Sequence, residues 1–427
     1  MNDKIVLGDC LEVMRDLPDD CVDSIVCDPP AGIAFMGKAW DSDKGGRLQW
    51  VAWMESVAAE CLRVMKPGGH ALVWALPRTS HWTGWAWESA GWEPRDKIVH
   101  LFGSGFPKNL DIGKALDKAA GAVRVQGPVD PARAGRLVNQ TGDYSTDAGW
   151  SAGNRKVTID PPATDAAKQW EGWGTALKPA GEDWWLFRKP LVGTVAANVL
   201  AHGTGGINID ACRIGRADGD RTEYGVDGDE RPSISTSLGD KARVAYEPAS
   251  GGRWPANVVL DEEAAALLDS QTGYMRDGVA VQRNGGGQNI GGVERRTGSS
   301  NKNALGARED VGYGGGGARF FYCAKASRSE RTHGGAVENK HPTVKPVSLM
   351  RYLVRLITPP GGSLLDLFCG SGSTLVAADL EGFDYLGIEN DPESHRTSCD
   401  RVAHAEMLRK KTDPKTPQAA EDIEGLE

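Results

Sequence analysis

Apolar positions near the start of the chain alternate between short runs and one long helical face. The runs at residues 5–7 and 22–27 predict strands, and the unbroken apolar run at residues 71–76 predicts a strand covered on both faces. Residues 50–65 instead place their apolar side chains at helical spacing, and Pro67-Gly68-Gly69 is expected to end this helix. Strands that alternate with helices predict a parallel sheet of the α/β class.

The same alternation returns near the other end of the chain. Strands are predicted at residues 364–368 and 385–389, and helices at residues 347–358, 373–381 and 392 to about 409. We therefore expect both ends of the chain to contribute to one sheet.

The middle of the chain is different in kind. Residues 109–167 and 193–317 are polar, rich in glycine and aperiodic. Between these stretches, residues 183–190 (DWWLFRKP) are typical of a strand that returns to the sheet. Because aperiodic stretches of this length are usually functional or disordered, we interpret the middle as a recognition insert with mobile loops.

The charge is distributed unevenly along the chain. With 427 residues and 40% hydrophobic side chains the chain can build a real core, and its net charge of −9 argues against a uniformly basic surface. Residues 271–331, however, carry ten Lys or Arg against five Asp or Glu. The tail from Thr412 carries five acidic residues against one Lys and is expected to be disordered.

Several classes of protein are disfavoured by what the sequence lacks. No apolar run approaches membrane-spanning length, and the first residues lead into a strand pattern rather than a signal peptide, so we expect a cytoplasmic protein. The eight cysteines show neither a C-x-x-C pair nor the Cys/His spacing of a zinc site. Reduced, mostly buried thiols and no metal site are therefore expected.

The first motif with chemical meaning is Asp28-Pro29-Pro30, which follows a predicted strand directly. The two prolines cannot donate backbone hydrogen bonds and hold the chain extended, so the Asp28 carboxylate and the Pro29 carbonyl would form a rigid set of acceptors. Such acceptors suit an amino group whose N–H protons must be held while its nitrogen attacks. A rigid turn with no chemical role remains an equal alternative for so short a motif.

The second motif is a strand, a Gly370-Ser371-Gly372 turn and a helix, and Glu389 ends the following strand. Glycines let the backbone approach a ligand closely, and an acidic residue at the next strand end can accept both hydroxyls of a ribose. Nicotinamide and adenosyl cofactors both fit this description. The dinucleotide fingerprint needs a third glycine at the position of Leu375, however, which disfavours a pyrophosphate.

Taken together, these segments resemble one family. The carboxyl-terminal segments ARFFYCAKASRSER and HPTVKPVSLMRYLVRLITPPGGSLLDLFCGSGSTLVAADLEGFDYLGIENDPE are similar to amino-directed, site-specific DNA methyltransferases, as are the amino-terminal segments LGDCLEVM and VDSIVCDPPAGIAFMGKAWD. The order of the motifs resembles the β-ordered group that is often found in phages and prophages, in which the catalytic half comes first and the cofactor half last.

This resemblance implies a circularly permuted, Rossmann-like methyltransferase sheet that binds S-adenosylmethionine and carries an irregular inserted target-recognition region. Double-stranded DNA would be the partner, with no membrane involved, and a homodimer stays open. The implied segments are the catalytic half (1–110), a polar insertion (111–167), a returning strand (168–192), the target-recognition region (193–317), the cofactor half (318–411) and an acidic tail (412–427).

The resemblance also assigns residues. Asp28, Pro29 and Pro30 would hold the target amine. The cofactor would be held by Asp366, Phe368, Gly370, Ser371 and Gly372 at its methionine end, Glu389 at its ribose, Thr343 and Lys345 near its carboxylate, and Asp9 near its adenosine. The candidates for contact with DNA phosphates are Arg283, Arg295, Arg296, Lys302 and Arg308.

Two of the neighbouring residues have simpler alternatives. Asp9 could equally be the N-cap of the following helix. His341 precedes Pro342 in the quoted segment and is expected to pack or to form hydrogen bonds rather than to act as a base.

One position departs from the family pattern. The catalytic tetrapeptide of the family usually ends in an aromatic residue that stacks on the target base, but this chain has Ala31. Stacking of a base on a protein ring is worth ~1–3 kcal/mol, so another aromatic residue is expected to supply the surface. The candidates are Phe35, Trp40 and Phe106, each of which could instead be a packing residue.

The function that these observations predict is transfer of a methyl group from S-adenosylmethionine to the exocyclic amine of a flipped base in DNA, as in restriction–modification. In the family that the chain resembles, a motif that begins with Asp tends toward adenine-N6 and one that begins with Ser toward cytosine-N4, so the resemblance implies adenine-N6 before cytosine-N4. Two more distant alternatives are an NAD-dependent oxidoreductase and a DNA-binding relative without catalytic activity.

Overall fold

The computed structural model describes residues 4–103, 105, 109–128, 137–138, 155–156, 160–215, 252–276, 314–324, 332, 335–339, 341 and 344–412. The chain divides into two compact units, one made of Met1–Gly103 with Gly181–Glu427 and the other of Ser104–Ala180. Within the described ranges, every helix is too short or too polar to cross a membrane.

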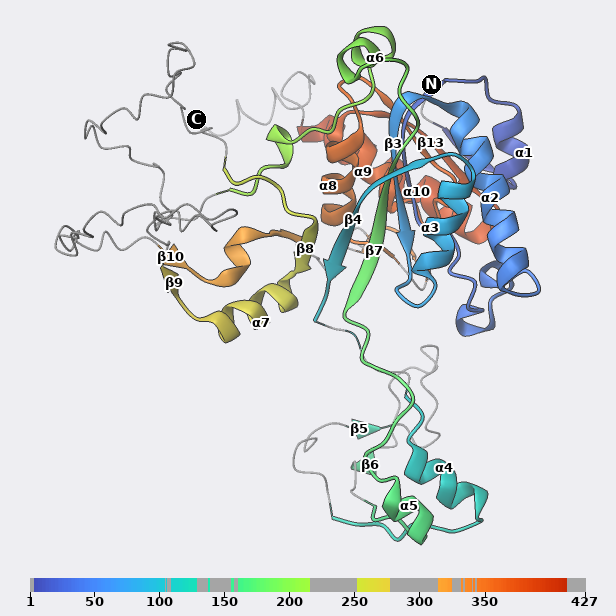
Figure 1. The fold of residues 1–427 in the computed structure, drawn as a ribbon, viewed down its shortest axis with the longest axis vertical. Coiled ribbons are helices and arrows are strands. Elements are labelled where there is room, and N and C mark those ends of the chain that lie inside the picture. The colour runs from blue at the N-terminus through green and yellow to red at the C-terminus, as the bar shows by residue number, and fades with distance from the viewer. Residues whose placement is uncertain are drawn as a thin grey trace, which may run out of the picture. The chain divides into compact units, whose positions relative to one another are not determined.

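The described part of the first unit is built on a nine-stranded sheet with the order β1-β13-β12-β2-β3-β7-β4-β8-β11 (Figure 1). The strands are β1 (Lys4–Leu7), β2 (Val22–Cys27), β3 (Met65–Ala75), β4 (Glu93–Leu101), β7 (Gly181–Arg188), β8 (Val258–Asp261), β11 (Tyr322–Ala324), β12 (Ser363–Asp366) and β13 (Asp384–Glu389).

Strands from the two ends of the sequence lie side by side in this sheet. The pairs β1·β13 and β12·β2 are both parallel, and Leu364 of β12 pairs with Ser24 of β2. The strand β7 is antiparallel to both β3 and β4, whereas the other pairs of the sheet are parallel. The predicted fold class, a permuted Rossmann-like α/β sheet of the methyltransferase type, is therefore confirmed.

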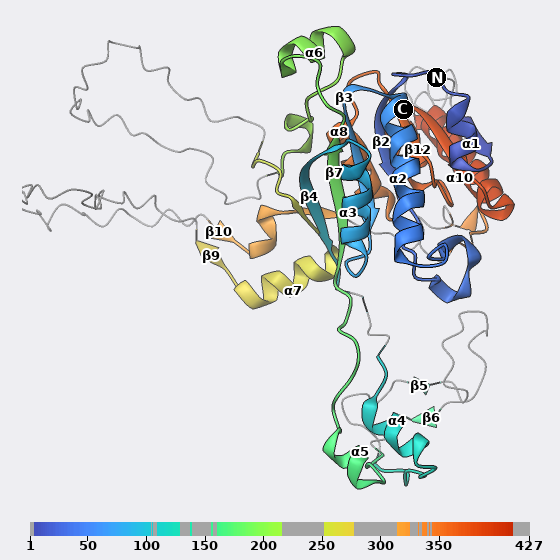
Figure 2. The ribbon, with the colours of Figure 1, turned by 45° about the vertical axis from the view of Figure 1, so that its right-hand side comes forward.

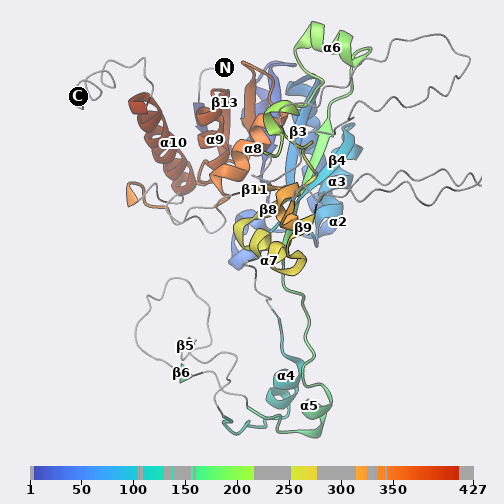
Figure 3. The same ribbon diagram turned by 90° about the vertical axis from the view of Figure 1, so that its left-hand side faces the viewer.

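Helices cover both faces of the sheet. On one face, α1 (Cys10–Arg15), α2 (Arg47–Val64) and α3 (Ser80–Ser89) lie together (Figure 2), and α1, α2 and α3 share a hydrophobic cluster with inward side chains of β2, β3 and β13. On the other face, α9 (Ser373–Glu381) contacts both α8 (Val347–Ile357) and α10 (Pro392–Thr412) (Figure 3). Buried residues of these three helices form a second cluster with β2, β3 and β7.

Most predicted elements are present in the structure, and the largest difference in a boundary lies between α2 and β3. The segment Pro67-Gly68-Gly69 does not separate the helix from the next strand, because α2 ends at Val64 and β3 already begins at Met65. A Cβ on Gly69 would lie 3.0 Å from the Asp23 carbonyl oxygen of β2, whereas Gly68 has a φ angle of +77° and lies against the Asn198 side chain. Close approach to β2 explains Gly69, and the left-handed backbone explains Gly68.

Several further elements lie in or beside segments where the sequence pattern gave no prediction. They include β4, β8, β11 and α7 (Glu262–Thr272), and the three strands belong to the main sheet. The strands β8 and β11 span four and three residues, too few for a recognisable alternation. The N-cap of α7 is Asp261, whose side chain accepts a hydrogen bond from the Ala264 N–H.

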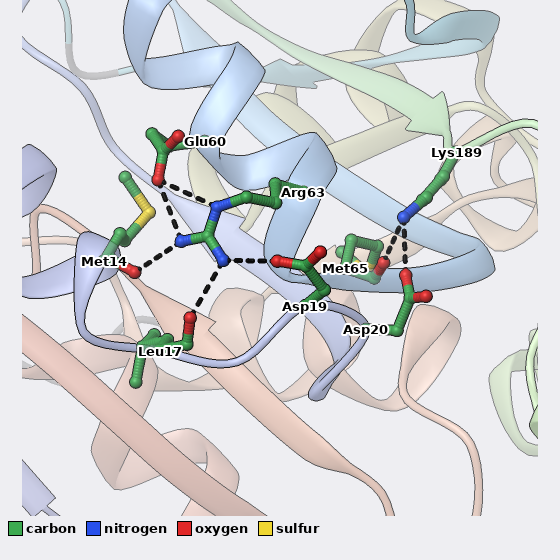
Figure 4. A network of polar contacts seen from close by, with 8 residues as sticks. All are labelled: Met14, Leu17, Asp19, Asp20, Glu60, Arg63, Met65 and Lys189. Carbon is green, nitrogen blue, oxygen red and sulfur yellow. Dashed lines mark hydrogen bonds and ion pairs between the residues drawn. The ribbon is translucent and has the colours of Figure 1, made fainter.

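Polar contacts fix the edge of the sheet at which β2 and β3 begin (Figure 4). The Arg63 guanidinium of α2 donates to the carbonyl oxygens of Met14 and Leu17 and pairs with Asp19 at 2.7 Å and with Glu60 at 2.9 Å. These contacts hold the loop between α1 and β2 against α2. The candidate site lies at the opposite edge, where the parallel strands have their carboxyl ends.

The second unit is inserted between β4 and β7, which pair so that Leu101 faces Gly181. Its described helices are α4 (Ile112–Ala119) and α5 (Asp165–Gln169). Two short strands, β5 (Leu137–Val138) and β6 (Arg155–Lys156), pair with each other. The buried Asp117 carboxylate accepts hydrogen bonds from Arg124 and from the backbone and side chain of Thr164. These contacts join α4 to the start of α5.

Candidate active site

The two sequence motifs meet at one edge of the sheet. The strand β2 ends at Cys27, directly before Asp28, and its neighbour β12 ends at Asp366. Because these strands are adjacent and parallel, the residues that follow their carboxyl ends lie at the same edge. The Asp28 and Asp366 carboxylates are close enough for the charge on Asp28 to raise the pKa of Asp366.

The Asp28 carboxylate is paired with Lys345. The Lys345 ammonium lies 2.9 Å from Asp28 Oδ2 and 4.2 Å from the ring centroid of Trp74 on β3. Burial raises the pKa of Asp28 above its ordinary value, although the nearby ammonium opposes this shift. The prediction that Lys345 belongs to the site is therefore consistent with the geometry, but its ammonium contacts Asp28 in this structure.

The chain after the prolines is held in a defined loop. The buried Asp41 carboxylate accepts hydrogen bonds from the backbone N–H groups of Gly32 at 2.9 Å and Phe35 at 2.7 Å. The Thr79 hydroxyl donates to the carbonyl oxygen of Ala31 at 3.1 Å. Asp41 thereby fixes the backbone that carries both Ala31 and the first of the proposed stacking residues.

The aromatic candidates differ in their surroundings. The Trp40 ring stacks on the His341 ring with centroids 6.5 Å apart and planes at 20°, so His341 packs as expected. A Cβ on Gly370 would lie 3.3 Å from His341 Nε2, so the His341 ring also lies against the glycine turn. Phe35 is half-buried, whereas Phe106 lies outside the described residues.

The glycine turn is tight, and buried side chains of α10 contact it. Gly370 and Gly372 have φ angles of +53° and +80°, and a Cβ on Gly372 would collide with the Ser398 side chain. The buried Arg401 guanidinium donates to the Ser371 carbonyl oxygen at 2.6 Å and to the hydroxyls of Ser371 and Ser373. These contacts hold the turn in the conformation that only glycine adopts readily.

Two carboxyl groups lie beside this turn. Glu389 accepts hydrogen bonds from the backbone N–H groups of Gly370 at 2.7 Å and Asp391 at 2.8 Å, and burial raises its pKa. Asp366 accepts from the Phe368 N–H at 3.1 Å, and burial raises the pKa of Asp366 to about 7.

The donors and acceptors around the turn fit an adenosyl amino acid better than a dinucleotide. Glu389 and Asp366 are acceptors for hydroxyl and ammonium groups, as the ribose and methionine ends of S-adenosylmethionine require. Leu375 is fully buried, and a Cβ on its neighbour Gly387 would collide with the Leu375 side chain. The first turn of α9 is therefore packed into the core, which agrees with the prediction against a pyrophosphate.

Asp9 is an N-cap in the structure. Its side chain accepts hydrogen bonds from the backbone N–H groups of Leu11 at 2.9 Å and Glu12 at 3.4 Å. The preceding residue, Gly8, donates its N–H to the Glu389 carbonyl oxygen at 2.9 Å. Asp9 therefore has the N-cap role that was the alternative to cofactor binding. It also directly follows Gly8, which is hydrogen-bonded to Glu389, the residue proposed to bind the ribose.

Some predicted site residues lie outside the described part of the chain. They are Thr343, Phe106, and the five basic candidates Arg283, Arg295, Arg296, Lys302 and Arg308. Their roles stay predictions.

The sequence analysis missed one charged residue of the site, Glu182. Its Oε2 atom lies 3.8 Å from the Lys345 ammonium and 3.8 Å from His100 Nδ1. Burial opposes a charge on Glu182, but the Lys345 ammonium and His100 outweigh it and lower its pKa to about 2. The sequence pattern gave no signal for this residue: because β7 is antiparallel, its first residues rather than its last lie at the edge of the site.

Comparison with known proteins supports one family. Residues 299–400 match the family model N6_N4_Mtase, described as DNA methylase. M.BamHI of Bacillus amyloliquefaciens, a type II methyltransferase, is 36% identical over 75 residues, which are 18% of each chain. M.BglII of Bacillus subtilis, another type II methyltransferase, is 28% identical over 116 residues, 25% of this chain and 31% of that protein. The matches thus span less than a third of either relative.

Solved structures with a similar fold include PvuII DNA methyltransferase (cytosine-N4-specific), with a TM-score of 0.41 and 12% identity over 96% of this chain and 92% of that one. The M1.HpyAVI-SAM complex has a TM-score of 0.39 and 13% identity over 93% and 98% of the two chains. The similarity to the N6_N4_Mtase family model is confined to residues 299–400.

Proposed function

We propose that this protein is a DNA methyltransferase that transfers a methyl group from S-adenosylmethionine to the exocyclic amine of a base, with adenine-N6 as the favoured target. The observation that supports it most strongly is the position of Asp28-Pro29-Pro30 at the same sheet edge as the Gly370 to Gly372 turn and Glu389. One motif supplies acceptors for an amine, and the other supplies a cradle for an adenosyl cofactor.

In this proposal the cofactor supplies an electrophilic methyl group, and the protein supplies orientation. Asp366, Phe368 and the glycine turn hold the methionine end, with Thr343 beside it, and Glu389 accepts from the ribose. The target base is rotated out of the duplex, because its amine cannot be reached inside the stack. The Asp28 carboxylate and the Pro29 carbonyl then accept the N–H protons of the amine and orient its nitrogen for in-line attack.

Cys27 has no role as a nucleophile in this proposal. It precedes Asp28 on β2, is fully buried, and burial raises its pKa well above the ordinary value. A thiolate nucleophile needs a lowered pKa and access to the substrate. Direct transfer to the amine, without a covalent enzyme intermediate, therefore suits the site.

The decisive experiment is to sequence DNA from a host that expresses the protein with a method that reports modified bases. We expect N6-methyladenine at one recurring sequence, absent from a host that carries the Asp28→Ala variant. N4-methylcytosine at a recurring sequence would keep the enzyme class and correct the target base. Unmodified DNA from a host with abundant folded protein would instead favour a DNA-binding relative without catalytic activity.

The oxidoreductase alternative is separated by ligand binding. Calorimetry should detect binding of S-adenosylhomocysteine and should detect no binding of NAD at the same concentration, because Leu375 takes the place of the third glycine in the dinucleotide fingerprint. NAD binding of comparable strength would overturn the assignment of the cofactor.

The missing aromatic residue at Ala31 leads to a prediction on base flipping. Trp40, which stacks on His341 beside the glycine turn, is the first candidate for the stacking surface, ahead of Phe35 and Phe106. Replacing Trp40 by Ala should reduce the fluorescence rise of 2-aminopurine at the target position and raise the KM for DNA by about tenfold, as expected for loss of one stacking contact. If all three alanine variants flip the base and methylate normally, none of these rings supplies the surface.

The partner in this proposal is double-stranded DNA, with the basic residues of the 271–331 region on its phosphates. An association with an endonuclease, as in restriction–modification, and a bacterial or phage-infected cell as the setting would agree with this function.

A further inference from the structure

Two carboxylates from separate segments contact Lys345, and a histidine contacts one of these carboxylates. Asp28 follows β2, Glu182 is the second residue of β7, and His100 lies near the end of β4, while Lys345 itself precedes α8. The Lys345 side chain is only 11% exposed, and its ammonium lies 2.9 Å from Asp28 and 3.8 Å from Glu182. Two carboxylates therefore share one cation.

The surroundings of Glu182 are those of a site rather than of a solvated ion pair. The side chains of Glu182 and His100 are 22% and 7% exposed. Against the effect of burial, the Lys345 ammonium, and after it the side chains of His100 and Trp74, lower the pKa of Glu182. A largely buried carboxylate that several polar groups hold in its charged form at one strand edge is a candidate for a functional role.

We infer that Glu182 is a positioning residue, which shares the Lys345 ammonium with Asp28 and thereby keeps the Asp28 carboxylate available to the target amine. This inference rests on the proposed function and extends it to a residue on a strand that carries none of the recognised motifs. Without Glu182, the ammonium would be neutralised by Asp28 alone. In this tighter ion pair, the Lys345 ammonium would compete with the N–H protons of the incoming amine for the Asp28 carboxylate oxygens.

Glu182 also sets the charge of the site. With Asp28 and Lys345 it leaves one negative charge in excess beside the amine. During transfer the N–C bond forms as the S–C bond breaks, so positive charge passes from the sulfonium to the amine, which then releases a proton to solvent. An excess negative charge at the amine end stabilises this movement of charge, and in a buried site its effect is large.

The test compares Glu182→Gln with Glu182→Asp and with a matched control, Glu93→Gln. Glu93 lies on β4 and pairs with Arg188 at the other end of β7, at 2.6 Å, so its replacement removes a carboxylate from the same strand pair away from the site. Glu182→Gln should lower kcat by about 10–100-fold and leave the affinity for S-adenosylhomocysteine within about twofold. Glu182→Asp should recover most of the activity, and Glu93→Gln should leave kcat unchanged.

The pH profile separates positioning from a merely structural role. The charged groups near Asp28 are Lys345, Glu182, Asp41 and Asp366, and Glu182 is one of those that raise the pKa of Asp28. Activity requires the Asp28 carboxylate and is lost as the pH falls through its pKa. Removing the Glu182 charge lowers that pKa, so the acid limb of kcat should move to lower pH in Glu182→Gln and stay in place in Glu93→Gln.

A second measurement does not depend on activity. The two carboxylates raise the pKa of Lys345 against the effect of burial. In Glu182→Gln the neutral fraction of Lys345 should grow, and its reductive methylation by formaldehyde and borohydride at pH 8 should be several-fold faster by peptide mass spectrometry. Unchanged labelling together with an unchanged acid limb would overturn the inference. A wild-type protein that methylates no DNA, with faster labelling in Glu182→Gln, would overturn the proposed function and leave the sharing of Lys345 intact.

Discussion

Replacing Asp28 by Ala should abolish methyl transfer while leaving the cofactor bound. Asp28 is the one carboxylate directly after β2, at the point where the Pro29 carbonyl completes the acceptor set. Loss of an oriented acceptor in a buried site lowers rates by about 10²–10³-fold, and here the substitution also leaves Lys345 opposite the amine, where its charge repels the cation that forms. We therefore expect a loss of at least about 10³-fold in single-turnover rate with tritiated S-adenosylmethionine.

The control for this variant is cofactor binding. Among the described residues, Asp28 forms its ion pair with Lys345 and no hydrogen bond with the glycine turn or with Glu389, so the affinity for S-adenosylhomocysteine should stay within about threefold of the wild type. The melting temperature should change little, because Glu182 still neutralises the Lys345 ammonium that Asp28 releases. Substantial methylation by Asp28→Ala would count decisively against its assignment as the residue that holds the amine.

Cofactor affinity should weaken as the pH falls through about 7. Burial raises the pKa of Asp366 from its ordinary value of 3.8 to about 7, so the carboxylate that would accept the methionine ammonium is protonated below this pH. The dissociation constant of S-adenosylhomocysteine should then rise by up to about tenfold for each pH unit below 7. Calorimetry between pH 8.5 and 6 measures this change in the dissociation constant directly. Glu389, whose pKa is also raised by burial, adds to the loss of affinity at the lower pH values.

Asp366→Asn provides the control and a second readout. The variant should bind the cofactor at least about 100-fold more weakly, with little pH dependence between 8.5 and 6.5. A folded-state pKa above the unfolded value means that Asp366 costs stability increasingly as the pH rises from about 4 to about 7. Asp366→Asn should thus raise the free energy of unfolding by about 1–3 kcal/mol at pH 8 and by little at pH 4.5. An affinity that is independent of pH in the wild type would refute the role of Asp366.

The periodic elements could be predicted from the sequence because their apolar patterns are long or are bounded by turn residues. The strand β2 and the helix α9 have the predicted limits, and α2 differs by three residues at its start. The strands β8 and β11 could not be predicted, because strands of four and three residues acquire their role only from pairing, β8 with β4 and β11 with β8. Tertiary contact, not local preference, defines these edges of the sheet.

The candidate site was predictable where a motif carries its chemistry in consecutive residues, as in Asp28-Pro29-Pro30 and the glycine turn. Glu182 has no such motif, and its importance depends on the antiparallel direction of β7, which the sequence pattern does not reveal. The predicted place of Lys345 near the cofactor carboxylate stays a prediction, and its contact with Asp28 follows from the path of the chain before α8. Arg401, which supports the glycine turn, lies on α10 and was likewise beyond the reach of pattern analysis.

The pairing of β1 with β13 has a consequence for how the protein is made. The strand β1 lies at the edge of the sheet, and its partner β13 is more than 370 residues further along the chain. A ribosome that builds the chain from its amino end therefore exposes β1 for most of translation before its partner exists. The sheet is completed only after synthesis of β13, so chains cut short before residue 384 should fail to close and should depend on chaperones or be degraded.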